Sequence, residues 1–119
     1  MNSMTIAGKL GGDAEQKYTT GGESIVSFSV AVNRPKKGGE KQAPYWFRVA
    51  VFGKYGESIL NFLTKGTTVA VQGELNARTY ESKGETKLSL DINARQVSLL
   101  GGGQDRQNDD DDSFDPNTL

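Results

Sequence analysis

Four aromatic side chains and one arginine lie within residues 45–52 (YWFRVAVF). If this segment is a strand, Trp46, Arg48 and Phe52 share one face, because successive side chains of a strand point to opposite sides. An unpaired guanidinium loses hydration on burial, so the face with Arg48 should be open to solvent. Exposed rings beside a guanidinium can stack on nucleobases while the cation lies near phosphates. The opposite face is expected to be the core side and carries Tyr45, Phe47, Val49 and Val51.

A second segment repeats this pairing of a cation with a ring. Asn76, Arg78 and Tyr80 fall on one face of an extended run, and Leu75, Ala77 and Thr79 fall on the other. By itself this pattern also fits an ordinary solvated hairpin, but two strands with the same pattern favour a stacking surface. The alternative for Trp46 and Phe52 is a second apolar layer beneath a loop or a partner subunit, and for Phe52 the two interpretations are evenly matched.

The segment 34–44 (RPKKGGEKQAP) combines prolines, glycines and cations, which is typical of a mobile loop. Its positive side chains would attract phosphates without regard to sequence, through an interaction that weakens steeply with salt. The alternative is a loop whose charges are simply solvated. The residues concerned are Arg34, Lys36, Lys37 and Lys41.

Apolar periodicity places these side chains on a small β-domain. Alternation predicts strands over 4–10, 25–33, 45–52, 67–81 and 86–99, with a further extended piece over 13–19. Residues 53–63 change period and predict a short helix with Tyr55, Ile59, Phe62 and Leu63 on one stripe. An all-β chain with one helix between its third and fourth strands suggests the five-stranded OB barrel, although topology alone also fits other small barrels.

Charge divides the chain of 119 residues into two parts. Residues 1–100 carry 13 Lys and Arg against 9 Asp and Glu, whereas residues 101–119 carry Arg106 against six aspartates. We therefore expect one folded domain over 1–100 and a disordered, acidic tail rich in Gly, Asn and Asp over 101–119. A basic body with an acidic tail suits a protein that binds a polyanion.

The absence of cysteine and histidine excludes disulfides, thiolate zinc sites and a Ser-His-Asp triad. We expect no metal, no cofactor and no catalysis. Residues 1–10 lack a basic segment followed by a long apolar stretch, and no run is long enough to cross a membrane. The expected location is the cytoplasm, in association with the nucleoid, or an organellar matrix.

Residues 44–54 (PYWFRVAVFGK) are similar to the central signature of bacterial-type single-stranded DNA-binding proteins. The segment 8–18 resembles the first segment of that family through Gly8-Lys9-Leu10-Gly11 and the following Asp13, Glu15, Lys17 and Tyr18. Lys65-Gly66 and Val71-Gln72-Gly73-Glu74-Leu75 also match, so the resemblance covers residues 2–100.

This resemblance implies an OB fold that assembles as a homotetramer and wraps single-stranded DNA, protecting it during replication, recombination and repair. It implies that bases stack on three rings and that cations contact the DNA backbone. The implied stacking residues are Trp46, Phe52 and Tyr80, and the implied backbone contacts are Arg48, Lys54, Arg78, Lys17 and Lys65.

The sequence departs from the family pattern at two places. Family members often carry a tryptophan at the start of the long loop, where this chain has Arg34-Pro35-Lys36-Lys37. The family tail ends in acidic residues and a terminal aromatic anchor that partner enzymes bind. Here Asp109, Asp110, Asp111, Asp112 and Phe114 resemble that motif, but Asp115–Leu119 follow it. The tail is therefore expected either to recruit replication and repair proteins or only to screen the basic face and aid solubility.

Two other functions compete with DNA binding. An OB domain that binds RNA would use the same stacking chemistry. Four successive aspartates, Asp109–Asp112, could in principle hold Mg²⁺ for catalysis. Adjacent residues in a Gly- and Asn-rich tail lack the rigid geometry that catalysis needs, so an enzyme is the less favoured interpretation.

Overall fold

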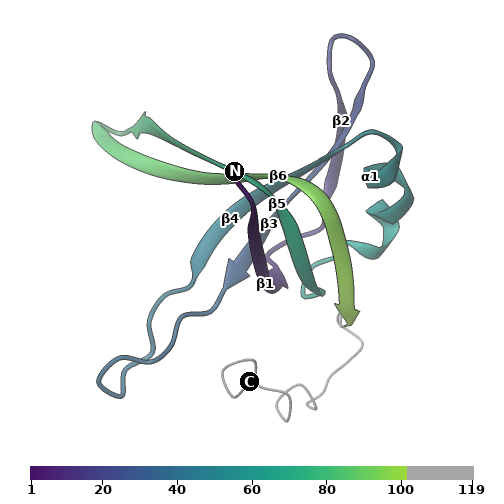
Figure 1. The fold of residues 1–119 in the computed structure, drawn as a ribbon. Coiled ribbons are helices and arrows are strands. Elements are labelled where there is room, and N and C mark those ends of the chain that lie inside the picture. The colour runs from purple at the N-terminus through teal and green to yellow at the C-terminus, as the bar shows by residue number, and fades with distance from the viewer. Residues whose placement is uncertain (102–119) are drawn as a thin grey trace.

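A computed structural model gives the structure of the chain and describes residues 1–101. The chain order is strand, strand, strand, strand, helix, strand, strand (Figure 1). The elements are β1 (Met4–Leu10), β2 (Glu15–Tyr18), β3 (Ser24–Val32), β4 (Tyr45–Phe52), α1 (Gly53–Ile59), the short 3-10 helix η1 (Leu60–Phe62), β5 (Thr68–Ser82) and β6 (Glu85–Gly101).

Five of the strands close into a ring in the order β1-β5-β6-β4-β3, and β1 then pairs with β3. β2 adds to the free part of β3. The ring closes where β1 passes from β5 to β3, because Lys9 and Leu10 pair with Ala31 and Val30. A Cβ on Gly8 would lie 2.1 Å from the Ala31 carbonyl oxygen, so this crossing requires glycine. The predicted OB barrel, with its helix after the third strand of the ring, is confirmed.

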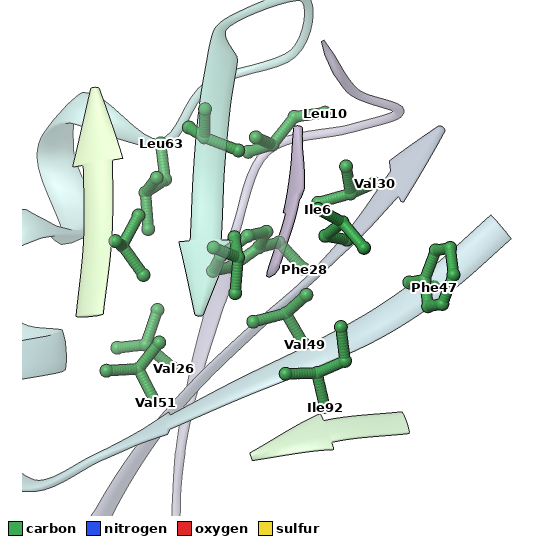
Figure 2. Close-up of a cluster of buried hydrophobic side chains, with 13 residues drawn as sticks. Ile6, Leu10, Val26, Phe28, Val30, Phe47, Val49, Val51, Leu63 and Ile92 are labelled. Carbon is green, nitrogen blue, oxygen red and sulfur yellow. The ribbon is translucent and has the colours of Figure 1, made fainter. Parts of the chain in front are cut away.

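The core lies inside the ring and follows the alternation of the sequence (Figure 2). Every second residue of β3 from Val26 to Val30, and of β4 from Phe47 to Val51, is buried. Burying such side chains contributes about 1.5–3 kcal/mol each. The full set is Ile6, Leu10, Val26, Phe28, Val30, Phe47, Val49, Val51, Leu63, Val69, Val71, Ile92 and Val97.

The helical segment covers one end of the barrel. Gly56 faces Val26, and Leu63 is buried after η1. Tyr55 binds α1 to β6 because its hydroxyl accepts the Val97 N–H at 2.8 Å and donates to the Val97 carbonyl at 3.1 Å. In residues 1–101, neither helical segment has the length and apolar character needed to cross a bilayer.

The expected helical stripe over residues 53–63 is wrong at Phe62, which is largely exposed. The α-helix ends at Ile59, and residues 60–62 continue as a 3-10 helix. A 3-10 helix has about 3.0 residues per turn instead of 3.6, so Phe62 rotates off the stripe, whereas Leu63, directly after η1, is buried.

The strand pairings differ in length. β4 and β6 are parallel and pair only where Arg48–Ala50 meet Asp91–Asn93. β5 and β6 instead pair along their whole length to Ser82 and Glu85. This hairpin therefore extends beyond the barrel (Figure 1), and residues 76–81 and 83–88 at its far end are exposed.

Candidate nucleic-acid interface

The outer face of β4 presents two rings and a cation to solvent. Trp46 is 53% exposed and Phe52 is 40% exposed, and Arg48 between them is also exposed. Phe47, on the opposite face, is only 4% exposed. The expectation that the face with Arg48 opens outward is confirmed. Within this chain, Trp46 and Phe52 do not form a second buried layer.

Tyr45 departs from the expected core side of this strand, because it is half exposed. It is the first residue of β4 and pairs with Val32 at the last position of β3, beyond the buried part of the barrel. The guanidinium of Arg34 lies over the ring of Tyr45, with Cζ 4.8 Å from the ring centre. Tyr45 is therefore exposed because it lies at the end of the strand, although alternation places it on the core side.

The register brings the second predicted segment onto the same side as Trp46. Arg48 pairs with Asp91, and Asp91 pairs with Asn76. Paired residues on neighbouring strands point to the same face of a sheet. Arg78 and Tyr80 follow Asn76 at steps of two, so they continue that face, and Tyr80 is 43% exposed. We call Trp46, Arg48, Phe52, Arg78 and Tyr80 the stacking face.

Three lysines predicted for backbone contacts lie at the border of the stacking face or away from it. Lys17 pairs with Ile25, which pairs with Phe52, so its side chain borders the stacking face. Lys54 is exposed in the first turn of α1, directly after Phe52. Lys65 is exposed in the connection before β5, outside the strands that form this face.

In the predicted basic loop, side-chain contacts hold the base in place, whereas the tip is exposed. Arg34 donates to the Gln42 side chain, and Gln42 donates to the Pro35 carbonyl at 2.9 Å. Together with its stacking on Tyr45, these contacts direct the Arg34 guanidinium at its own loop. Lys36 and Lys37 are exposed, and Lys37 forms a β-bridge with Glu40. These two lysines can still reach an anion, whereas Arg34 organises the base of the loop.

An ion pair organises the centre of the stacking face. Arg78 Nε lies 2.7 Å from Asp91 Oδ2, and Ser89 donates to Asp91 Oδ1 at 2.7 Å. Burial of the Asp91 carboxyl raises its pKa. The hydrogen bonds from Arg78 and Ser89 and the charges of Arg78 and Arg48 outweigh burial, so the pKa of Asp91 is held below its ordinary value of 3.8. Asp91 therefore remains ionised at neutral pH between two arginines.

Asp91→Asn is expected to lower the urea midpoint of unfolding at neutral pH and to have no effect in acid. A carboxyl with a lowered folded-state pKa stabilises the fold above its unfolded pKa of about 3.9 and loses this contribution as the pH falls through the folded value. The midpoints of parent and variant should differ modestly at neutral pH, because the pair is partly exposed, and converge once the pH has fallen below the lowered pKa of Asp91. Glu81→Gln is the control, and a gap that is independent of pH would contradict the assignment.

A groove of about 480 Å³ runs beside Trp46. It is lined by Trp46 and Arg48 of β4 and by the connection from β1 to β2. Ser27 and Ser29 of β3 also line the groove, and alternation in the sequence does not by itself bring them beside Trp46. The lining residues are Gly11, Gly12, Asp13, Glu15, Ser27, Phe28, Ser29, Trp46 and Arg48.

The predicted tail residues Asp109, Asp110, Asp111, Asp112 and Phe114 lie outside the described residues. The division at residue 100 between a folded domain and a tail therefore stays a prediction. Within residues 1–101, no group of three or more acidic side chains is placed to hold a metal ion.

Comparison with known proteins decides the family. Residues 1–100 match the model of the single-strand binding protein family. The chain belongs to this family. The match covers every element from β1 to the end of β6 apart from Gly101, so the stacking face lies wholly within the family domain.

Two bacterial proteins are similar to most of the chain. The chain is 39% identical over 114 residues to a single-stranded DNA-binding protein of Treponema pallidum, covering 92% of this chain and 65% of the relative. It is 37% identical over 106 residues to one of Xanthomonas campestris, covering 86% of this chain and 62% of the relative. The chain thus spans less than two thirds of the length of these relatives.

A solved structure shares the fold. The Plasmodium falciparum SSB complex with ssDNA superposes with a TM-score of 0.66 and 22% sequence identity, over 85% of this chain and 96% of that chain. The two chains thus share this barrel although most of their residues differ.

Proposed function

We propose that this chain binds single-stranded DNA without sequence preference and performs no catalysis. The observation that carries the proposal is the stacking face, where three exposed rings share one side of the barrel with two arginines. Membership of the single-strand binding protein family supports the same function. Flat rings accept the face of any base, which explains binding that ignores sequence.

Stacking and charge divide the work of binding. Each base that stacks on Trp46, Phe52 or Tyr80 contributes about 1–3 kcal/mol. Arg48, Arg78 and Lys54 contact phosphates, and Lys17, Lys36 and Lys37 add longer-range attraction. Lys65 adds attraction from outside the stacking face. Arg34 acts indirectly, because it holds the base of the loop that carries Lys36 and Lys37. Release of counterions from the DNA makes the affinity fall as salt rises.

The functional assembly in this proposal is a homotetramer. Over residues 4–8, β1 pairs with β5 on one side only, which leaves a strand edge open within the described chain. Such an edge can pair with a strand of another copy. Leu88, Leu99 and Leu100 add exposed apolar side chains that an assembly can cover.

The cellular role follows from the binding. The chain coats unpaired strands during replication, recombination and repair, in the cytoplasm of a bacterium or in an organellar matrix. Asp109–Asp112 and Phe114 recruit enzymes that act on the coated strand. A carboxylate run with an aromatic side chain suits a basic pocket with an apolar floor on such a partner.

The function is tested by competition among nucleic acids. The full chain is titrated with labelled oligo-dT, and unlabelled oligo-rU or duplex DNA of equal length competes. We expect oligo-dT to bind most tightly, with quenching of Trp46 fluorescence and a logarithmic affinity that falls linearly with the logarithm of salt concentration. Light scattering of the same samples gives the mass of the assembly.

Two outcomes would overturn the proposal. Preference for oligo-rU would assign the barrel to RNA. Binding that leaves Trp46 fluorescence unchanged would remove the stacking face from the interface.

A further inference from the structure

We propose that Gly11 is a positioning residue for Trp46: its missing side chain leaves the space in which the indole rests. A Cβ built on Gly11 would lie 2.7 Å from Trp46 Cζ3 and 2.9 Å from Trp46 Cη2. Real Cβ atoms do not approach so closely, so any other residue at this position displaces the ring or the backbone. The ring therefore lies against the bare backbone of the β1–β2 connection.

The backbone at this position is fixed by its neighbours. Three hydrogen bonds of 2.9–3.0 Å tie the connection to segments on different sides. The bonds run from Gly11 N–H to the Ser29 carbonyl, from Leu10 N–H to the Thr67 carbonyl and from Ala14 N–H to the Leu63 carbonyl. The Asp13 carboxylate also accepts the Lys65 N–H at 2.8 Å. Moving the backbone would break several of these bonds.

The indole can be displaced more easily than this backbone. Trp46 is 53% exposed, and rotation about its two side-chain torsions can carry the ring into solvent. A larger residue at position 11 is therefore expected to displace the ring and leave the connection in place. In the native protein, Gly11 lets the indole rest against the β1–β2 connection, beside the groove. The ring therefore loses less conformational freedom when a base stacks on it.

The neighbouring glycine supplies a matched control. A Cβ on Gly12 meets no atom within 4 Å, although Gly12 lines the same groove. The φ angle of neither Gly11 nor Gly12 lies in the left-handed region. Side chains are therefore compatible with the backbone at both positions, and only the contact with the indole distinguishes them.

The first test uses the free protein and does not depend on the proposed function. Fluorescence reports the ring directly, because Trp46 is the single tryptophan. We expect Gly11→Ala and, more strongly, Gly11→Val to shift its emission to longer wavelength and to increase quenching by acrylamide. Gly12→Ala and Gly12→Val should leave both unchanged, and urea melts should show that all four variants are folded. Equal spectra for the two pairs would overturn the proposal.

The second test concerns binding and rests on the proposed function. Titration with labelled oligo-dT should show about fivefold to tenfold weaker binding for Gly11→Val, the low end of the effect of losing one stacked base. In the Trp46→Ala background, Gly11→Val should cause no further loss, because both substitutions act on one ring. An additive loss would show that Gly11 acts on DNA without Trp46, whereas a parent that does not bind would contradict only the proposed function.

Discussion

Replacing Trp46 with alanine is expected to weaken binding of oligo-dT by about 1–3 kcal/mol and to leave the urea midpoint nearly unchanged. The ring is more than half exposed, so its removal creates no cavity in the core. It is also a wall of the groove beside the β1–β2 connection, so its removal takes away a surface on which a base can lie. Anisotropy of a labelled oligonucleotide measures the affinity without relying on tryptophan fluorescence.

Trp46→Phe is the matched control for this substitution. It retains a flat ring at the same place and should recover most of the affinity, because stacking needs a π-face more than a particular heterocycle. A variant with alanine that binds as tightly as the parent would remove Trp46 from the interface. A large drop in its urea midpoint would instead assign the ring to the fold.

Phe47→Ala, one residue along the strand, is expected to have the opposite effect. The side chain of Phe47 points into the barrel and is only 4% exposed. Truncating a buried phenylalanine costs about 3–5 kcal/mol, through lost burial and the cavity that remains. Since small domains are stable by only about 5–15 kcal/mol, this is a large share of the total. Urea unfolding followed by circular dichroism gives the change.

Phe47→Leu keeps this comparison informative if the alanine variant does not fold. Leucine fills part of the space, so its loss of stability should be smaller than that of alanine, and its affinity for oligo-dT should match the parent. A Phe47 variant with an unchanged midpoint would reverse the assignment of the two faces of β4. The pair Trp46 and Phe47 thus separates binding from folding at neighbouring positions.

Alternation in the sequence predicted most of the fold and the outward face of β4. Both follow from local chemistry, because a guanidinium at position 48 fixes which parity faces water and a strand carries that choice along its length. The same rule failed at Tyr45 and Phe62, where the regular element ends. Parity and helical period hold only while the backbone repeats and the neighbouring layer continues.

The remaining features depend on contacts between segments that are distant in the sequence. The ion pair of Arg78 with Asp91 follows from the register of the β5–β6 hairpin, which alternation alone does not fix. The approach of Gly11 to Trp46 requires the barrel to close. Arg34 was predicted from its charge to contact DNA, but its guanidinium is directed at Tyr45 and Gln42. Composition gives the charge of a side chain and not its direction.

The two shortest pairings divide the backbone of the barrel into halves that share a core but are joined by few ladder positions. One half contains β2, β3 and β4, and the other contains β1, β5 and β6. Five residue pairs, from the β1–β3 and β4–β6 pairings, join the two halves. Brief opening of a folded protein occurs preferentially where few contacts must break. The stacking face crosses the junction at Arg48 and Asp91, and the indole lies over the other junction at Gly11. A polynucleotide bound across this surface would therefore contact both halves of the barrel and hold them together.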